Sequence, residues 1–198
     1  MKKSFFISLF ITGAVFLACS SLLLGLTSYL HPLVIPVVIC CFFFFFYSLI
    51  LLLRKENLEI SYCLFTGIIA VYTISLLVLL FFRPNLQYNY GYNLIPFSTI
   101  SFYLSGKVKM IIAFYNLAAN IGLFVPFGIY LMLSSKKSFV THVIVPLIWI
   151  ILIEIAQLLT HRGSLDIDDL ILNFLGITIG YIVYPVFNKI VTIKKGAR

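Results

Sequence analysis

The chain of 198 residues is 62% hydrophobic and only 10% charged. A water-soluble domain carries about 25% charged residues, so this composition excludes one. Its continuous apolar runs reach about 20 residues, the length that a helix needs to cross a hydrocarbon core. Strands of a membrane β-barrel would instead alternate apolar and polar residues. The sequence therefore predicts an all-α, polytopic membrane helix bundle.

The net charge of +8 comes from basic residues at the ends of the apolar runs, not from one basic face. Bases in such places set membrane orientation and contact anionic lipid head groups. Nucleic-acid binding would need a basic face, so membrane lipids are the predicted partners and nucleic acid is not. The cysteines lie inside apolar runs without metal-binding spacing, and we interpret them as small hydrophobic residues: Cys19, Cys40, Cys41 and Cys63.

Residues 1–82 are predicted to form a scaffold of three membrane-spanning helices, over Phe5–Leu30, Leu33–Leu53 and Ile60–Phe82. The basic start also fits a cleaved signal, but the first apolar run is longer than the usual 7–15 residues of one. These runs carry few polar side chains beyond Ser, Thr and Tyr. No functional role follows from them.

Residues 83–198 form the second predicted region and have a different character. The loop Arg83–Lys109 is rich in Tyr, Asn and Pro and long enough to have a structure of its own. We expect a short helix over Phe97–Leu104 that lies in the membrane interface or dips back into the membrane. Three further spans are predicted over Met110–Leu133, Phe139–Leu159 and Leu170 to about Phe187.

The distribution of Lys and Arg predicts the orientation. With six spans, ten of these residues fall on the side of the termini and four on the opposite side. Cytoplasmic loops carry the excess of Lys and Arg. Both termini are therefore predicted to be cytoplasmic, and both polar loops to face outward from a multi-pass protein of the cell membrane.

Glu154 is the polar residue that most needs an explanation. It lies roughly 8 Å below the outer end of the fifth predicted span, and Gln157 follows one turn higher on the same face. An ionised carboxylate at this depth is costly and is a functional candidate by default. The alternative is a salt bridge to Arg83 or Arg162 that only holds helices together.

The outer halves of the last three spans and their loops hold the other polar candidates. Asn116 and Asn120 share one helix face, although each could simply form interhelical hydrogen bonds. Asp166 and Asp168 could cap the next helix, with Asp169 in its first turn. We group the ligand-binding candidates as one outward-facing pocket: Arg83, Asn93, Asn116, Asn120, Glu154, Gln157, Arg162, Asp166, Asp169 and Asn173.

Such a pocket suits a ligand with phosphate, carboxylate or amide groups. Arginines would bind anions in bidentate fashion, and the acids would orient them, bind an ammonium group, act as a base or hold a divalent cation. The chain contains no P-loop, HExxH, GxSxG or CxxC motif, so no catalytic residue and no cofactor can be named. His161 has only carboxylates near it in the sequence, and we predict no metal site.

Several blocks of this region together resemble the VanZ family of bacterial membrane proteins. They are Arg83, the NLIPF of Asn93–Phe97, Asn120 with the LFVPFG of Leu123–Gly128, Glu154 with Gln157, and Arg162–Asn173 followed by two glycines. The likeness covers Arg83–Tyr184 in the family's order and spacing. The glycines form a GxxxG close-packing face, and the residues that we assign to packing are Pro96, Pro126, Gly128, Gly176 and Gly180.

The resemblance implies a role at the cell envelope in resistance to the glycopeptide antibiotic teicoplanin. It implies no agreed reaction, cofactor or catalytic residue. Our first hypothesis is a protein that binds an envelope precursor or the antibiotic in the outward pocket. The alternative is an integral membrane enzyme that modifies a lipid or a lipid-linked envelope precursor. A transporter and an accessory protein of a larger complex are weaker interpretations.

Overall fold

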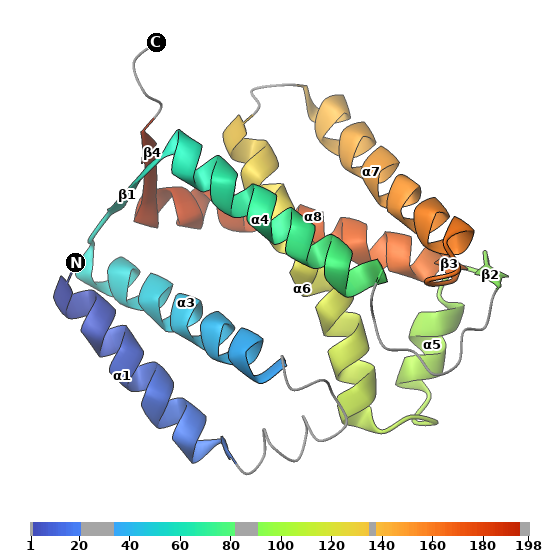
Figure 1. Cartoon of the computed structure of the whole chain (residues 1–198), viewed down its shortest axis with the longest axis horizontal. Coiled ribbons are helices and arrows are strands. Elements are labelled where there is room, and N and C mark those ends of the chain that lie inside the picture. The colour runs from blue at the N-terminus through green and yellow to red at the C-terminus, as the bar shows by residue number, and fades with distance from the viewer. Residues whose placement is uncertain (1, 21–33, 82–90, 135–137, 195–198) are drawn as a thin grey trace. The chain divides into compact units, whose positions relative to one another are not determined.

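A computed structural model of the chain describes residues 2–20, 34–81, 91–134 and 138–194 (Figure 1). Helices dominate this described part. They are α1 (Lys2–Ala18), α3 (Val34–Arg54), α4 (Tyr62–Phe81), α5 (Ser98–Leu104), α6 (Met110–Ser134), α7 (Phe139–Leu159) and α8 (Ile167–Ile190). Four short strands accompany them: β1 (Leu58–Ser61), β2 (Tyr92–Asn93), β3 (Leu165–Asp166) and β4 (Val191–Lys194).

Four of these helices are long and apolar enough to cross a membrane, namely α4, α6, α7 and α8. They match the third to sixth predicted spans, and α7 has the predicted bounds. The short helix predicted in the loop is α5. In the first predicted span, α1 ends at Ala18 and residues 21–33 lie outside the described part. The total of six spans and the cytoplasmic termini stay predictions.

The strands were not predicted. The third span was expected to begin at Ile60, which is wrong, because Leu58–Ser61 pair in parallel with Val191–Lys194 instead. Likewise β2 pairs in parallel with β3, with Tyr92 opposite Leu165. Pairing of residues so far apart in the chain leaves no local sequence signal.

The chain divides into two compact units, one of residues 1–62 with 186–198 and one of residues 63–185. In the first unit α1 packs on α3, where the rings of Phe5 and Phe43 lie 5.3 Å apart. The Ser4 hydroxyl donates to Glu56 at 2.8 Å. A small core forms around Leu51 and the end of α8.

The second unit has a core to which each of its four long helices contributes one buried residue: Leu76, Phe124, Ile150 and Ile177. Here α6 and α8 approach closely at three glycines. A Cβ on Gly176 would overlap the carbonyl oxygen of Ile121, and one on Gly128 would overlap that of Ile177. Small residues permit this distance between helix backbones, so the middle of α8 lies close against α6.

Prolines lie inside α6, α7 and α8. Pro146 has no N–H, so it cannot donate to the carbonyl of His142 four residues earlier. The hydroxyl of Tyr181 on α8 donates to that carbonyl at 2.6 Å instead. The second unit therefore replaces, from a neighbouring helix, a backbone hydrogen bond that its own sequence removes.

Candidate functional site

The candidate site lies in the second unit, where the chain passes from α7 to α8. Residues 91–100, called the strap from here on, run beside this connection and lead into α5 (Figure 1). The β2–β3 pairing joins the strap to the connection, and the N–H of Leu165 donates to the carbonyl of Gly91 at 3.3 Å. The polar side chains of the site come from these two segments and from the helices below them.

Asp166 ties the strap to the start of α8. Its carboxylate accepts hydrogen bonds from the Thr99 hydroxyl at 2.6 Å and from the Asn93 amide at 3.2 Å. It also accepts the N–H of Asp168 at 2.9 Å, as an N-cap residue does. This cap explains why α8 begins at Ile167 and not at the predicted Leu170.

Asp168 is fully buried, and its carboxylate binds backbone N–H groups of the strap. One carboxylate oxygen accepts the N–H of Phe97 at 2.5 Å, and the other accepts those of Thr99 at 2.7 Å and Ile100 at 3.1 Å. The first N–H groups of a helix have no partner within it. A carboxylate from the first turn of α8 therefore satisfies the N-terminal donors of α5.

Glu154 lies beneath the connection on α7, with 4% of its surface exposed. Its Oε2 accepts one long hydrogen bond, 3.4 Å from the N–H of Asp166, and no other bond to this side chain is found in the described part of the chain. An ionised carboxylate has about four lone-pair sites. Glu154 thus keeps unused capacity to accept hydrogen bonds.

A cavity of about 60 Å³ lies at the connection between α7 and α8. Its lining residues are Ile151, Glu154, Leu165, Asp166, Ile167 and Leu170. The atoms that face this space are apolar, and Glu154 is one of the two acidic residues that line it.

A second polar group lies on the face of α8 that meets α6. The amide of Asn120 donates to Asp169 at 2.6 Å. Asn173 follows Asp169 by one turn on the same face; it is 4% exposed, and its Oδ1 has no hydrogen-bond partner within the described residues. A buried acceptor without a donor is uncommon and calls for an explanation such as a bound water or ligand.

The remaining candidates are more dispersed than the sequence suggested. The Asn116 amide donates to the carbonyl of Ile112 in its own helix at 2.8 Å. The Gln157 amide donates to the carbonyl of Leu80 on α4 at 3.3 Å. Arg162 is exposed just after α7, and Arg83 lies outside the described residues. The hydrogen bonds of the described residues thus connect Asn93 and Glu154 through Asp166, and connect Asn120 to Asp169.

Two residues of this arrangement were missed from the sequence. Asp168 was interpreted only as a possible cap of its own helix, and Thr99 was not considered. Both act across 67 to 71 residues of chain, so spacing alone could not reveal them. Within the described residues, no group of three or more His, Cys, Asp or Glu side chains is arranged to hold a metal ion.

Taken together, the four apolar helices and the buried polar groups define a helical membrane protein with a polar site at the α7–α8 connection. The model of the VanZ/LLP1 family matches residues 69–188, and the chain belongs to this family. The chain is 29% identical to Protein VanZ from Enterococcus faecium over 134 residues, which are 65% of this chain and 78% of that relative. No solved structure matches the chain.

Proposed function

We propose that this VanZ-family protein is a multi-pass protein of the cytoplasmic membrane that binds a cell-envelope precursor or a glycopeptide at the outer face and so contributes to teicoplanin resistance. The observation that carries the proposal is the state of Glu154. It is a buried carboxylate with one long hydrogen bond beside a cavity. Its neighbour Asp166, by contrast, accepts three.

The chemistry of the site supports a ligand that donates hydrogen bonds. Glu154, with one long hydrogen bond among the described residues, and the unpartnered Oδ1 of Asn173 are acceptors. Amide, ammonium and hydroxyl groups of peptides and sugars are the matching donors. Envelope precursors and glycopeptides both carry such groups. Arg162, exposed beside the connection, would then bind a carboxylate or phosphate of the same ligand.

The orientation rests on the distribution of Lys and Arg, which favours an outward position for the α7–α8 connection. The envelope precursors that glycopeptides bind are presented on that side of the membrane. An outward site is therefore the position in which such a ligand would be met.

The experiment is to produce the protein in a teicoplanin-susceptible bacterium and to measure the minimal inhibitory concentration. We expect the wild-type chain to raise it and Glu154→Gln to abolish the rise, with equal amounts of both proteins in the membrane. Glu59→Gln is the control, because this acid is 58% exposed and pairs with Lys194. Both residues belong to the first unit, and the site belongs to the second. Equal inhibitory concentrations for the wild type and Glu154→Gln would refute the role of Glu154.

One observation favours a second candidate, an enzyme that modifies a lipid or a lipid-linked precursor. A buried carboxylate with free lone pairs beside a cavity is also what a general base needs. In that case, a deletion strain would lack a lipid species that wild-type protein restores and Glu154→Gln does not. An unchanged lipid profile in the deletion strain would exclude this candidate.

A further inference from the structure

At the end of the strap and the start of α5, consecutive backbone N–H groups all donate hydrogen bonds within the protein. Each backbone N–H from Phe97 to Ser101 has an acceptor within the protein. Asp168 accepts three of these five, and the other two bond to carbonyls of the segment itself. The first donors of a helix at a protein surface could equally bond to water. Here a buried carboxylate accepts these N–H groups, which indicates that water does not surround them.

The side chains of the same segment are apolar and exposed. Five of them form what we call the apolar tip, with exposed fractions of 57% for Leu94, 70% for Ile95, 59% for Phe97, 48% for Phe102 and 71% for Leu104. Large exposed apolar side chains gathered in one short segment mark contact with a partner or a membrane.

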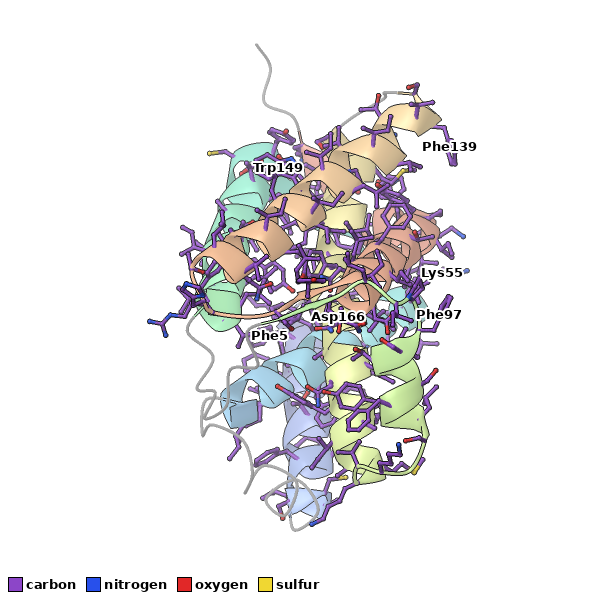
Figure 2. All side chains as sticks on the ribbon, turned by 90° about the vertical axis from the view of Figure 1, so that its right-hand side faces the viewer. Phe5, Lys55, Phe97, Phe139, Trp149 and Asp166 are labelled. Atoms are coloured by element: carbon purple, nitrogen blue, oxygen red, sulfur yellow. The ribbon has the colours of Figure 1, made fainter. Side chains whose placement is uncertain are left out.

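Phe97 shows that the structure holds this exposure in place. Its φ of 64° lies in the left-handed region, which is unfavourable for a bulky residue. Its N–H is held by the fully buried Asp168. The ring is therefore exposed while the backbone N–H is anchored on a buried residue, and Figure 2 shows Phe97 at the right-hand edge of the molecule.

The position of the tip in the chain favours lipid as its partner. It lies between α4 and α6, both long and apolar enough to cross a membrane, and α6 begins at Met110, shortly after the end of the tip. The residues between α5 and α6 include Lys107 and Lys109, whose positive charge suits anionic lipid phosphates. Where water is scarce, backbone groups must find partners within the protein, which is the condition that Asp168 meets.

We propose that the apolar tip inserts into the boundary between head groups and acyl chains of the membrane leaflet at the α7–α8 connection, with Asp168 as the positioning residue that permits the insertion. This goes beyond the proposed binding function, since it concerns how the segment beside the site is held in the membrane. It makes no use of a ligand.

The test places a fluorescent probe in the tip of the whole protein. The chain has a single tryptophan, Trp149, which is 63% exposed on α7. Phe97→Trp is made in a Trp149→Phe background and reconstituted into phosphatidylcholine and phosphatidylglycerol vesicles. The unchanged chain gives the reference for a residue in lipid. Glu59→Trp in the same background gives the reference for a residue in water.

Quenching by brominated acyl chains and by aqueous iodide is then compared. We expect the probe at position 97 to be quenched by bromolipid as Trp149 is, and to lose most of the iodide quenching that position 59 shows. Quenching by iodide to the extent seen at position 59 would overturn the proposal. So would shielding from both reagents, which would mean that protein, such as a second copy of the chain, covers the tip.

Asp168→Asn separates the positioning role from general folding. One carboxylate oxygen is lost, so we expect the probe at position 97 to lose bromolipid quenching and gain iodide quenching. In a separate variant that carries only Asp168→Asn, Trp149 should stay in lipid. If the probe at position 97 kept its bromolipid quenching, the role of Asp168 would be wrong. If Asp168→Asn does not accumulate, Ile100→Pro, which removes one of the N–H donors to Asp168 and no polar side chain, provides the same comparison.

Discussion

Asp168 and Glu154 are two buried carboxylates of the same unit with opposite surroundings. Asp168 accepts three short backbone hydrogen bonds and is fully enclosed. Glu154 accepts one bond of 3.4 Å and lines a cavity. Burial alone would rank them as equals. Their hydrogen bonds separate a group that holds the strap in place from a group with capacity left for a ligand.

This difference has a physical basis. Burying a carboxylate costs free energy unless hydrogen bonds or charges compensate. For Asp168 the compensation is visible in the structure, and its removal would leave three donors without an acceptor. For Glu154 little compensation is visible among the described residues, so its presence is better explained by what enters the cavity. Stability and function should therefore respond to different substitutions.

The largest effect on stability is expected from Asp168→Ala. Three backbone donors would lose their acceptor, and each unsatisfied buried donor costs about 1–3 kcal/mol. We expect the free energy of unfolding to fall by about 3 kcal/mol or more, measured by thermal unfolding in detergent. Glu59→Ala, which removes an exposed acid, is the control and should change little. Equal melting temperatures for Asp168→Ala and wild type would show that Asp168 does not stabilise the fold, which is one half of the comparison.

A second prediction concerns the close packing of α6 against α8, the helix that carries Asp168. In Gly180→Ala the new Cβ would overlap the Val125 carbonyl and lie 2.8 Å from the Cα of Gly128. We expect a loss of about 1–3 kcal/mol, as for an overpacked core. Gly122→Ala on α6 is the matched control, because nothing lies within 4 Å of its Cβ position. If both variants unfold at the same temperature, the close crossing does not support the site.

A smaller effect is expected from Tyr181→Phe, which removes one neutral hydrogen bond to the His142 carbonyl. The loss should be about 1 kcal/mol. In a Pro146→Ala background the helix can supply its own N–H to that carbonyl, so the loss should nearly vanish. A double-mutant cycle of melting temperatures measures this coupling. Additive effects would show that the tyrosine does not replace the missing backbone bond.

The long elements could be predicted from the sequence, since an apolar run of about 20 residues is a local signal. The bounds of α7 followed directly from the apolar run between Phe139 and Leu159. The start of α8 was predicted at Leu170, three residues too late, although Asp166 had been named as a possible cap and does cap the helix. Neither parallel ladder has a local signal, since Leu58 pairs with Val191, which is far away in the chain.

The site shows the same limit. Glu154 could be predicted as a candidate because it lies deep in a predicted span of a chain with few charged residues. It is only 12 residues from Asp166, so the sequence also predicted that these two residues belong to one site. Asp168 was passed over because its partners, from Phe97 to Ile100, lie some 70 residues earlier. Asn116 was grouped with the site through helical periodicity, but its amide bonds within its own helix. Periodicity gives the face of a side chain and not its partner.

The contrast between the two carboxylates is tested most directly by the melting temperatures of Glu154→Gln and Asp168→Asn in one detergent. The glutamine can still accept the N–H of Asp166 and has nearly the same size and shape, so we predict that Glu154→Gln melts at or above the wild-type temperature. Asp168→Asn, which loses one carboxylate oxygen, should melt several degrees lower. A Glu154→Gln variant destabilised as much as Asp168→Asn would contradict the account, because Glu154 would then hold the fold and not a ligand.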